Sequence, residues 1–136
     1  MTPADQARLL LRKAAQDQAV LEKLIDDPAI EAATLGVHAQ QAVEKLIKAL
    51  LALGGHDYPR SHDLSLLLDL LASVGLQLPE EFLVVETLTP FATVYRHDDL
   101  PLEEAPDPRD WPPLLRALER HVSRAIEGVE SPPALP

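Results

Sequence analysis

The chain has 136 residues, of which 46% are hydrophobic but only five are aromatic, and it contains no cysteine. A chain of this length is one domain by the usual size of domains, and the lack of cysteine excludes a disulfide framework, thiolate metal sites and cysteine catalysis. The net charge of −10 argues against a surface that binds nucleic acid everywhere, although it leaves room for one basic cleft.

The first predicted helix runs from Pro3 to about Ile25, because proline suits the first helical position and residues 26–28, Asp-Asp-Pro, stop the helix. Its inward stripe contains Leu10, Ala14, Asp17, Leu21 and Leu24. An ionised carboxylate on an apolar stripe needs a partner or must stay at the solvated edge. Lys45 or His38 of the next helix could be the partner of Asp17, and a solvated Asp17 is the alternative.

The second helix is predicted to begin between Ala29 and Thr34 and to end at Leu53, where two glycines supply a left-handed cap. Apolar residues recur along it at helical spacing and form a core stripe: Leu35, Ala39, Ala42, Leu46, Ala49 and Leu53. A polar stripe lies beside the core stripe and contains His38, Gln41, Lys45 and Lys48. Glu44 precedes Lys48 by four residues, which is the favoured orientation for an ion pair within a helix.

Two more helices are predicted in the middle of the chain. Ser61 is expected to cap the third helix, with His62 in its first turn and Gly75 at its end. The fourth helix starts at Pro79, and Pro90 is expected to kink it because an interior proline loses a hydrogen bond and clashes with the preceding turn.

The last helix is predicted to begin near Asp107 or Asp110 and to end at Gly128. Arginines recur every four residues on its outer side, at positions 116, 120 and 124, a pattern typical of a solvated face and less often of a seat for phosphates. The fold class is therefore all-α, an antiparallel up-and-down bundle of four main helices plus a short or kinked extra helix, with a domain over residues 3–128 and a disordered tail over 129–136. The chain has no targeting segment or membrane span, so a cytoplasmic location is expected.

Several motifs resemble the HEPN domain, the higher eukaryotes and prokaryotes nucleotide-binding domain. Residues 40–51, two glutamines followed by Ala-x-Glu-Lys-x-x-Lys-Ala-Leu-Leu, are similar to its second helix. Residues 59–64, Pro-Arg-Ser-His-Asp-Leu, are similar to its Pro-Arg-[Thr/Ser]-His-x-Leu entry to the third helix. Residues 88–89 and 95–96 are similar to its Leu-Thr…Tyr…Arg ending. The resemblance covers residues 4–128 and implies a helical bundle that forms a homodimer.

HEPN ribonucleases carry an arginine four to six residues before a histidine, and the resemblance implies that such pairs from two subunits cut RNA without metal. A histidine can take the proton of a 2′-hydroxyl, and an arginine can stabilise the charge that develops on phosphorus. The catalytic candidates are Arg96 with His97 and Arg116 with His121. About one match such as Arg116 to His121 is expected by chance in this composition, and no histidine lies four to six residues after Arg96, so the sequence departs from the nuclease pattern.

The chain instead resembles the prokaryotic HEPN branch whose members end in Arg-Tyr-Pro-Asp and are encoded beside a minimal nucleotidyltransferase. Arg96-His97-Asp98-Asp99 stands in that place. The resemblance implies a binding module in a toxin–antitoxin-like pair, which holds a nucleotide or completes the partner transferase. The alternatives are a metal-independent ribonuclease toxin, with RNA as substrate, and a structural dimerisation domain without a ligand. Neither a cofactor nor a metal is expected.

The predicted binding site is an anion site formed by Lys45 and Arg96 and oriented by Gln41 and His38. Its cations would repel each other unless Asp17 or an incoming phosphate supplied negative charge. The alternative is an internal network in which Asp17 pairs with Lys45 or Arg96 and nothing else binds. A two-fold dimer is predicted from apolar positions beyond those that one stripe per helix needs, namely Val43, Ile47, Leu50, Leu51 and Val84.

Overall fold

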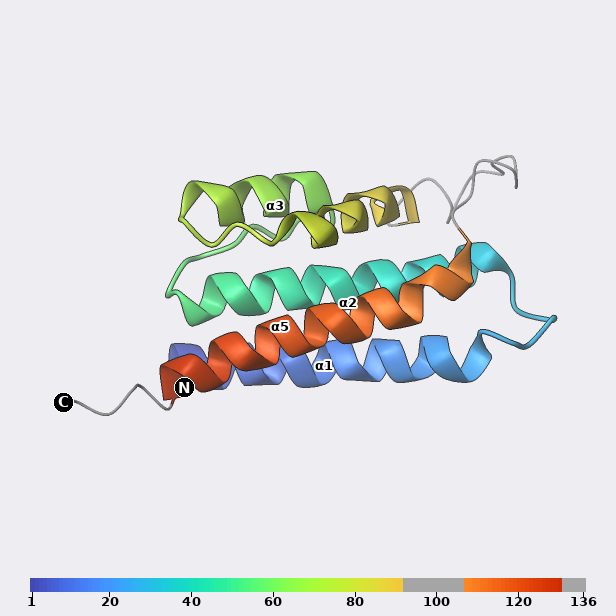
Figure 1. The fold of residues 1–136 in the computed structure, drawn as a ribbon, viewed down its shortest axis with the longest axis horizontal. Helices are drawn as coiled ribbons and strands as arrows, with labels where there is room; N and C mark the ends of the chain where they lie inside the picture. Colours follow the sequence, from blue (N-terminus) through green and yellow to red (C-terminus); the bar gives the residue numbers. More distant parts are fainter. Residues whose placement is uncertain (92–106, 131–136) are drawn as a thin grey trace.

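The computed structural model describes residues 1–91 and 107–130, which form helices joined by turns and loops (Figure 1). The helices are α1 (Pro3–Leu24), α2 (Ala32–Leu53), α3 (Leu64–Ser73), the 3-10 helix η1 (Glu80–Leu88), the short 3-10 helix η3 (Pro108–Asp110) and α5 (Trp111–Glu130). The described ranges contain no strand, and the predicted all-α class is confirmed.

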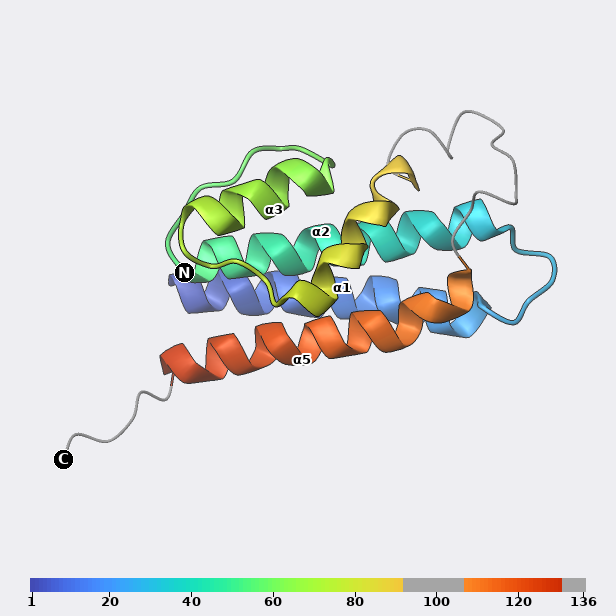
Figure 2. The same ribbon diagram turned by 45° about the horizontal axis from the view of Figure 1, so that its top comes forward.

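Helices α1, α2 and α5 run side by side, and α3 and η1 form a second layer on the α2 side (Figures 1 and 2). α1 and α5 are antiparallel, because Arg8 pairs with Glu130 at one end and Arg116 pairs with Glu22 at the other. None of the helices in the described ranges combines the length and apolar character that a membrane span requires.

Helix α3 departs from the alternating directions of an up-and-down bundle (Figure 2). It begins beside the middle of α2, where Gln40 Nε2 donates to the carbonyl oxygen of His62 at 3.1 Å. The turn after α3 reaches the end of α2, where Leu76 lies next to Gly54. The connection over residues 54–63 therefore carries the chain back along α2, so that α3 runs parallel to α2.

This connection is held against the bundle by Tyr58. Its hydroxyl accepts a hydrogen bond from Gln6 Nε2 of α1 at 3.2 Å, and its ring centroid lies 5.6 Å from Lys48 Nζ of α2. A cation over an aromatic face is attracted by the ring electrons. Gly55, with a φ of 76°, makes the turn that starts the connection, as the predicted left-handed cap requires.

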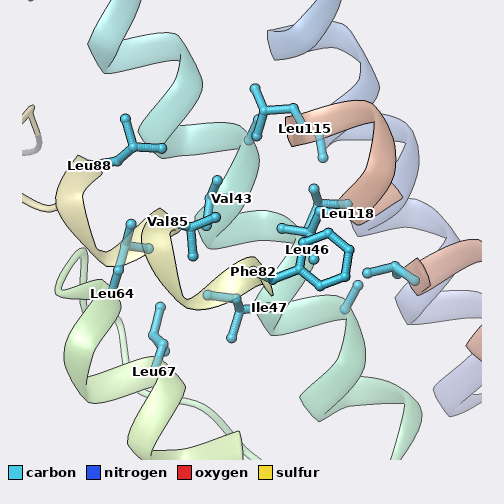
Figure 3. Packing of buried hydrophobic residues seen from close by; sticks show 14 of the residues in the cluster. Val43, Leu46, Ile47, Leu64, Leu67, Phe82, Val85, Leu88, Leu115 and Leu118 are labelled. Carbon is cyan, nitrogen blue, oxygen red and sulfur yellow. The ribbon is translucent and has the colours of Figure 1, made fainter. Parts of the chain in front are cut away.

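Every main helix contributes to one apolar core centred on α2 (Figure 3). The predicted core stripe of α2 is buried except for the partly buried Leu53. Facing it are Leu64 and Leu67 of α3, Phe82, Val85 and Leu88 of η1, and Leu115 and Leu118 of α5. Because α1, α3, η1 and α5 all pack on α2, this helix has little apolar surface left for a partner.

The four residues of α2 that the sequence assigns to a dimer surface are part of this core. Val43, Ile47, Leu50 and Leu51 are at most 5% exposed. The interpretation of these positions as surplus apolar surface is wrong, because α3 and η1 cover the face that a single stripe would leave open. Val84 of η1, by contrast, is 52% exposed.

The start of α3 differs from the prediction. Asp63, not Ser61, is the N-cap, and its side chain accepts from the backbone N–H groups of Ser65 and Leu66. Ser61 Oγ instead accepts from the backbone N–H of Asp63 at 3.1 Å. His62 lies before the helix and not in its first turn. Aspartate and serine are both good caps, so composition alone does not choose between them.

The predicted fourth helix is a 3-10 helix over Glu80–Leu88. A 3-10 helix has three residues per turn, and the buried residues Phe82, Val85 and Leu88 are spaced by three. Pro90 begins the next helical turn and does not interrupt η1, while Thr89 Oγ1 accepts from the backbone N–H of Leu64 at 3.3 Å. The apolar spacing in the sequence continues to Ala92 and Tyr95, and that part of the predicted helix lies outside the described residues.

Phe91 packs into α2 at a glycine. A Cβ atom at Gly36 would lie 2.2 Å from Phe91 Cδ1, so only glycine admits the ring at this distance. Phe91 also meets Trp111 edge to face, with 5.2 Å between ring centroids. This contact brings the end of the η1 region to the start of α5.

At its other end, α5 continues to Glu130, two residues beyond the predicted end at Gly128.

Candidate functional site

Of the two alternatives for Asp17, the structure shows the pairing with the second helix and not the solvated carboxylate. Asp17 of α1 is buried, and its Oδ2 accepts a hydrogen bond from Lys45 Nζ of α2. Buried carboxylates need a compensating charge or hydrogen bonds, and Lys45 supplies both. The Lys45 side chain remains 30% exposed, so the ion pair lies at the edge of the α1–α2 interface and faces solvent.

Two further residues of the polar stripe lie on α2 within one or two turns of Lys45. The Nδ1 atom of His38 is buried without a hydrogen-bond partner, 3.5 Å from Asp17 Oδ1. Gln41 is half-buried and makes no side-chain hydrogen bond in the described part of the chain. The structure therefore brings together Asp17, His38 and Lys45, with Gln41 on the same face, whereas Arg96 and His97 lie outside the described residues.

The literal arginine and histidine match on α5 is not brought together within the chain. Arg116 points toward α1, where its guanidinium donates to Glu22. His121 lies on the side of α5 that faces η1, with its ring centroid 5.6 Å from that of Phe82. Five residues along an α-helix turn through about 500°, which places the two side chains on different faces.

A second polar cluster, the Glu44 network, lies on the other edge of the polar stripe. The Glu44 carboxylate, 9% exposed, accepts from Lys48 Nζ at 2.7 Å and from Gln40 Nε2 at 3.0 Å. His62 Nδ1 lies 2.9 Å from Glu44 Oε2. The network joins the middle of α2 to the segment that enters α3, and the Glu44 and Lys48 part of it confirms the ion pair expected from their spacing.

The Glu44 network keeps its carboxylate charged. Burial alone would raise the pKa of Glu44, but the hydrogen bonds from Lys48, His62 and Gln40 outweigh it and hold that pKa below the usual range. An ionised Glu44 accepts from the His62 Nδ1–H, which leaves Nε2 of the 66% exposed ring facing solvent.

Sequence reasoning found the Glu44 and Lys48 pair but missed that Gln40 and His62 complete it. The available signal was position: Gln40 and Glu44 are four apart and share a face of the helix with Ile47 and Leu51, which indicates that both are largely buried. Nothing in the sequence states that His62 returns to the middle of α2, because that depends on the reversed connection before α3.

No three histidine, aspartate or glutamate side chains in residues 1–91 and 107–130 come together in a way that could hold a metal ion. The chemistry available on α2 is thus that of charged and amide groups: Lys45 with Asp17, Gln41 and His38 on one edge, and Glu44 with its donors on the other.

These features define a class of protein: a small all-α bundle whose central helix is apolar on the faces that pack and carries ordered ion pairs on the face left open. The HEPN domain family model matches residues 7–130, and the chain therefore belongs to the HEPN family. No curated protein and no solved structure matches the chain.

Proposed function

We propose that this protein is a HEPN-type binding module of a toxin–antitoxin-like pair and that its partner is a minimal nucleotidyltransferase. In this proposal, the polar stripe on α2 binds the phosphate of a nucleotide. The observation that carries the proposal is the position of Lys45. Its ammonium group is anchored by Asp17, yet its side chain is still 30% exposed beside Gln41 and His38.

The Lys45 ammonium group has N–H donors that remain available for a ligand. An ammonium group carries three N–H donors, and Asp17 uses one of them. A phosphate oxygen can accept from the others, while the Gln41 amide and the His38 ring on the same face can supply orientation. Because the charges of Asp17 and Lys45 cancel, phosphate binding at this site relies more on directed hydrogen bonds than on long-range electrostatic attraction.

Metal-independent RNA cleavage is supported less well. That chemistry needs a histidine to take a proton and an arginine to stabilise the developing charge at the same phosphate. Within one copy Arg116 and His121 turn toward different neighbours, and Arg96 and His97 lie outside the described residues, so no contact in the described part of the chain directs an arginine and a histidine at one phosphate.

An NMR titration of the isotope-labelled chain with ATP tests the proposal. Amide shifts on residues 38–48 should report binding at the polar stripe, and Lys45→Ala should weaken the ATP affinity measured from those shifts about tenfold or more, as expected for lost charge-assisted hydrogen bonds. Lys23→Ala is the matched control, because Lys23 is exposed and has no ion pair in the described part of the chain. ATP binding that is equal in the two variants would contradict the proposal.

Asp17→Asn separates a binding site from a purely internal network. Removing the competing carboxylate should tighten ATP binding, whereas an internal network would lose stability without any change in affinity.

Cleavage of single-stranded RNA that persists in EDTA and disappears in His121→Ala or His97→Ala would favour the ribonuclease instead.

A further inference from the structure

A groove between α1 and α5, away from the polar stripe, is lined by two guanidinium groups. It consists of two adjoining hollows of about 430 Å³ and about 350 Å³, and both are lined by Arg116 and Arg120. The larger hollow lies between the two helices and is completed by Leu11 and Ala15 of α1 and by Glu119 and Ser123 of α5. The smaller hollow is completed by Pro112 and Pro113 and is lined by α5 alone. Together these eight residues are the α1–α5 groove.

The two arginines of the groove differ in their interaction partners. Arg116 is fixed by Glu22 of α1, with which it shares a hydrogen bond and an ion pair. Arg120 is exposed and has no hydrogen bond or ion pair within residues 1–91 and 107–130. They lie one helical turn apart, a rise of about 6 Å, so both guanidiniums can reach the oxygens of a single tetrahedral anion.

Glu119 gives the groove a third polar group. Its Oε1 atom is buried and has no hydrogen-bond partner in the described residues, although a buried polar atom is normally paired. The charged groups that face it are Glu22 from α1 and Arg116 from its own helix, with Arg120 on the same wall. Burial, followed by repulsion from Glu22, raises the pKa of Glu119.

A phosphate group in the larger hollow would meet both Arg120 and the Glu119 carboxyl group, which line it. Arg120 is a donor without an acceptor, and Glu119 in its neutral form is an O–H donor that needs an acceptor. An oxyanion seated between the arginines supplies acceptors for both, and its charge favours the protonated form of a neighbouring carboxyl group. The proton comes from solvent, and no covalent bond changes.

We propose that the α1–α5 groove is an oxyanion site, which holds a phosphate group between Arg116 and Arg120 and takes up a proton on Glu119 as the anion binds. The site is independent of the polar stripe on α2. Inorganic phosphate and the phosphate of a nucleotide share the recognised chemistry.

Sulfate is the probe for the pH series, because its own charge does not change over the range in which Glu119 titrates. NMR shifts at residues 116–123 should report binding here, while shifts on α2 report the polar stripe, so the two proposals fail separately. Affinity at the groove should fall by up to about tenfold for each pH unit above the pKa of Glu119. Affinity that does not change with pH would overturn the role of Glu119.

Three variants complete the test. Arg120→Ala should weaken sulfate about tenfold or more, while Arg124→Ala, one turn further along the same row and outside both hollows, should leave it unchanged. Glu119→Gln keeps a donor that cannot titrate, so it should bind sulfate at high pH as tightly as the wild type binds it at low pH. Equal binding by the two arginine variants would overturn the site.

The source of the phosphate is decided by comparing inorganic phosphate with AMP at residues 116–123. Equal affinities would identify the phosphate group as the whole ligand, and tighter AMP binding would identify a nucleotide. Both results support the site, whereas the failure of both ligands to shift these resonances would overturn it.

Discussion

Gly36 is the residue at which a single methyl group should matter most. Phe91 occupies the space where a Cβ atom would be, 2.2 Å away at the nearest ring atom. We expect Gly36→Ala to reduce the free energy of unfolding by about 1–3 kcal/mol, because the buried ring must shift. Urea denaturation measures this loss.

Gly128 is the matched control for this change. It also lies in an α-helix, but nothing comes within 4 Å of an added Cβ. Gly128→Ala should therefore stabilise the chain by up to about 1 kcal/mol through helix propensity. A stabilisation of the same size in Gly36→Ala would mean that Phe91 does not pack as described.

Glu44 should make stability depend on pH. Its pKa is lower in the folded chain than in the unfolded chain, so its contribution is present above the unfolded value and is lost as pH falls through the folded value. Glu44→Gln should lower the free energy of unfolding at pH 7 by about 1.5–3 kcal/mol, and the difference from the wild type should shrink in acid below the ordinary glutamate range.

Denaturation curves at several pH values follow this change. Asp69→Asn is the control, since Asp69 is exposed on α3 and has no side-chain partner in the described part of the chain. A gap between the wild type and Glu44→Gln that stays constant down to acidic pH would show that the Glu44 network does not hold a charged carboxylate.

At the level of residues, the sequence predicts pairs within one helix or between sequential helices. Glu44 with Lys48 follows from helical spacing. For Asp17, an acid on an apolar stripe indicates a partner on the next helix, and the structure shows that Lys45, not His38, donates the hydrogen bond. Partners that depend on a loop path, such as His62, cannot be predicted in this way. The groove around Glu119 is also missed, because its buried oxygen becomes visible only when α1 and α5 are placed together.

At the level of elements, the cap of α3 offers a direct test. Asp63→Ala removes the acceptor for two backbone N–H groups and should cost about 1 kcal/mol of unfolding free energy. Ser61→Ala removes only one acceptor outside the helix and should cost less. Thermal denaturation of the two variants would contradict the assignment if Ser61→Ala proved the more damaging change.

The bounds of a helix were predicted well where proline or glycine marks its ends. The type of helix was predicted poorly where the residue spacings of an α-helix and a 3-10 helix are similar. Proline and glycine place the ends of α1 and α2 within a residue or two. For η1, apolar residues spaced by three fit both an α-helix and a 3-10 helix, so the spacing alone does not distinguish the two. The parallel direction of α3 was not predictable, because a ten-residue connection is long enough to turn back or to continue.

At the scale of the molecule, the expected two-fold dimer must use a different face from the one that the sequence suggests. The surplus apolar residues of α2 are buried within the chain, and of the five proposed positions only Val84 on η1 is exposed. We therefore place the expected dimer contact on the outer face of η1.

Sedimentation equilibrium tests this assignment. The wild type should give a species of twice the 14.9 kDa chain mass at micromolar concentration, and Val84→Asp should shift it to the monomer. Val129→Asp is a control with a similarly exposed valine, 56%, on α5. A wild-type monomer, or equal dissociation by both changes, would reject η1 as the contact.

The ion pair between Arg8 and Glu130 joins residues 122 positions apart. Helix α5 therefore closes the core only after residues 111–130 have followed α1 and α2 out of the ribosome, since its buried row from Trp111 to Ile126 covers α1 and α2. During synthesis, the apolar face of α1 and α2 that α5 covers stays exposed until α5 has formed. A chaperone that shields nascent apolar helices would meet this protein at that stage, and chains halted before α5 should be the ones that aggregate.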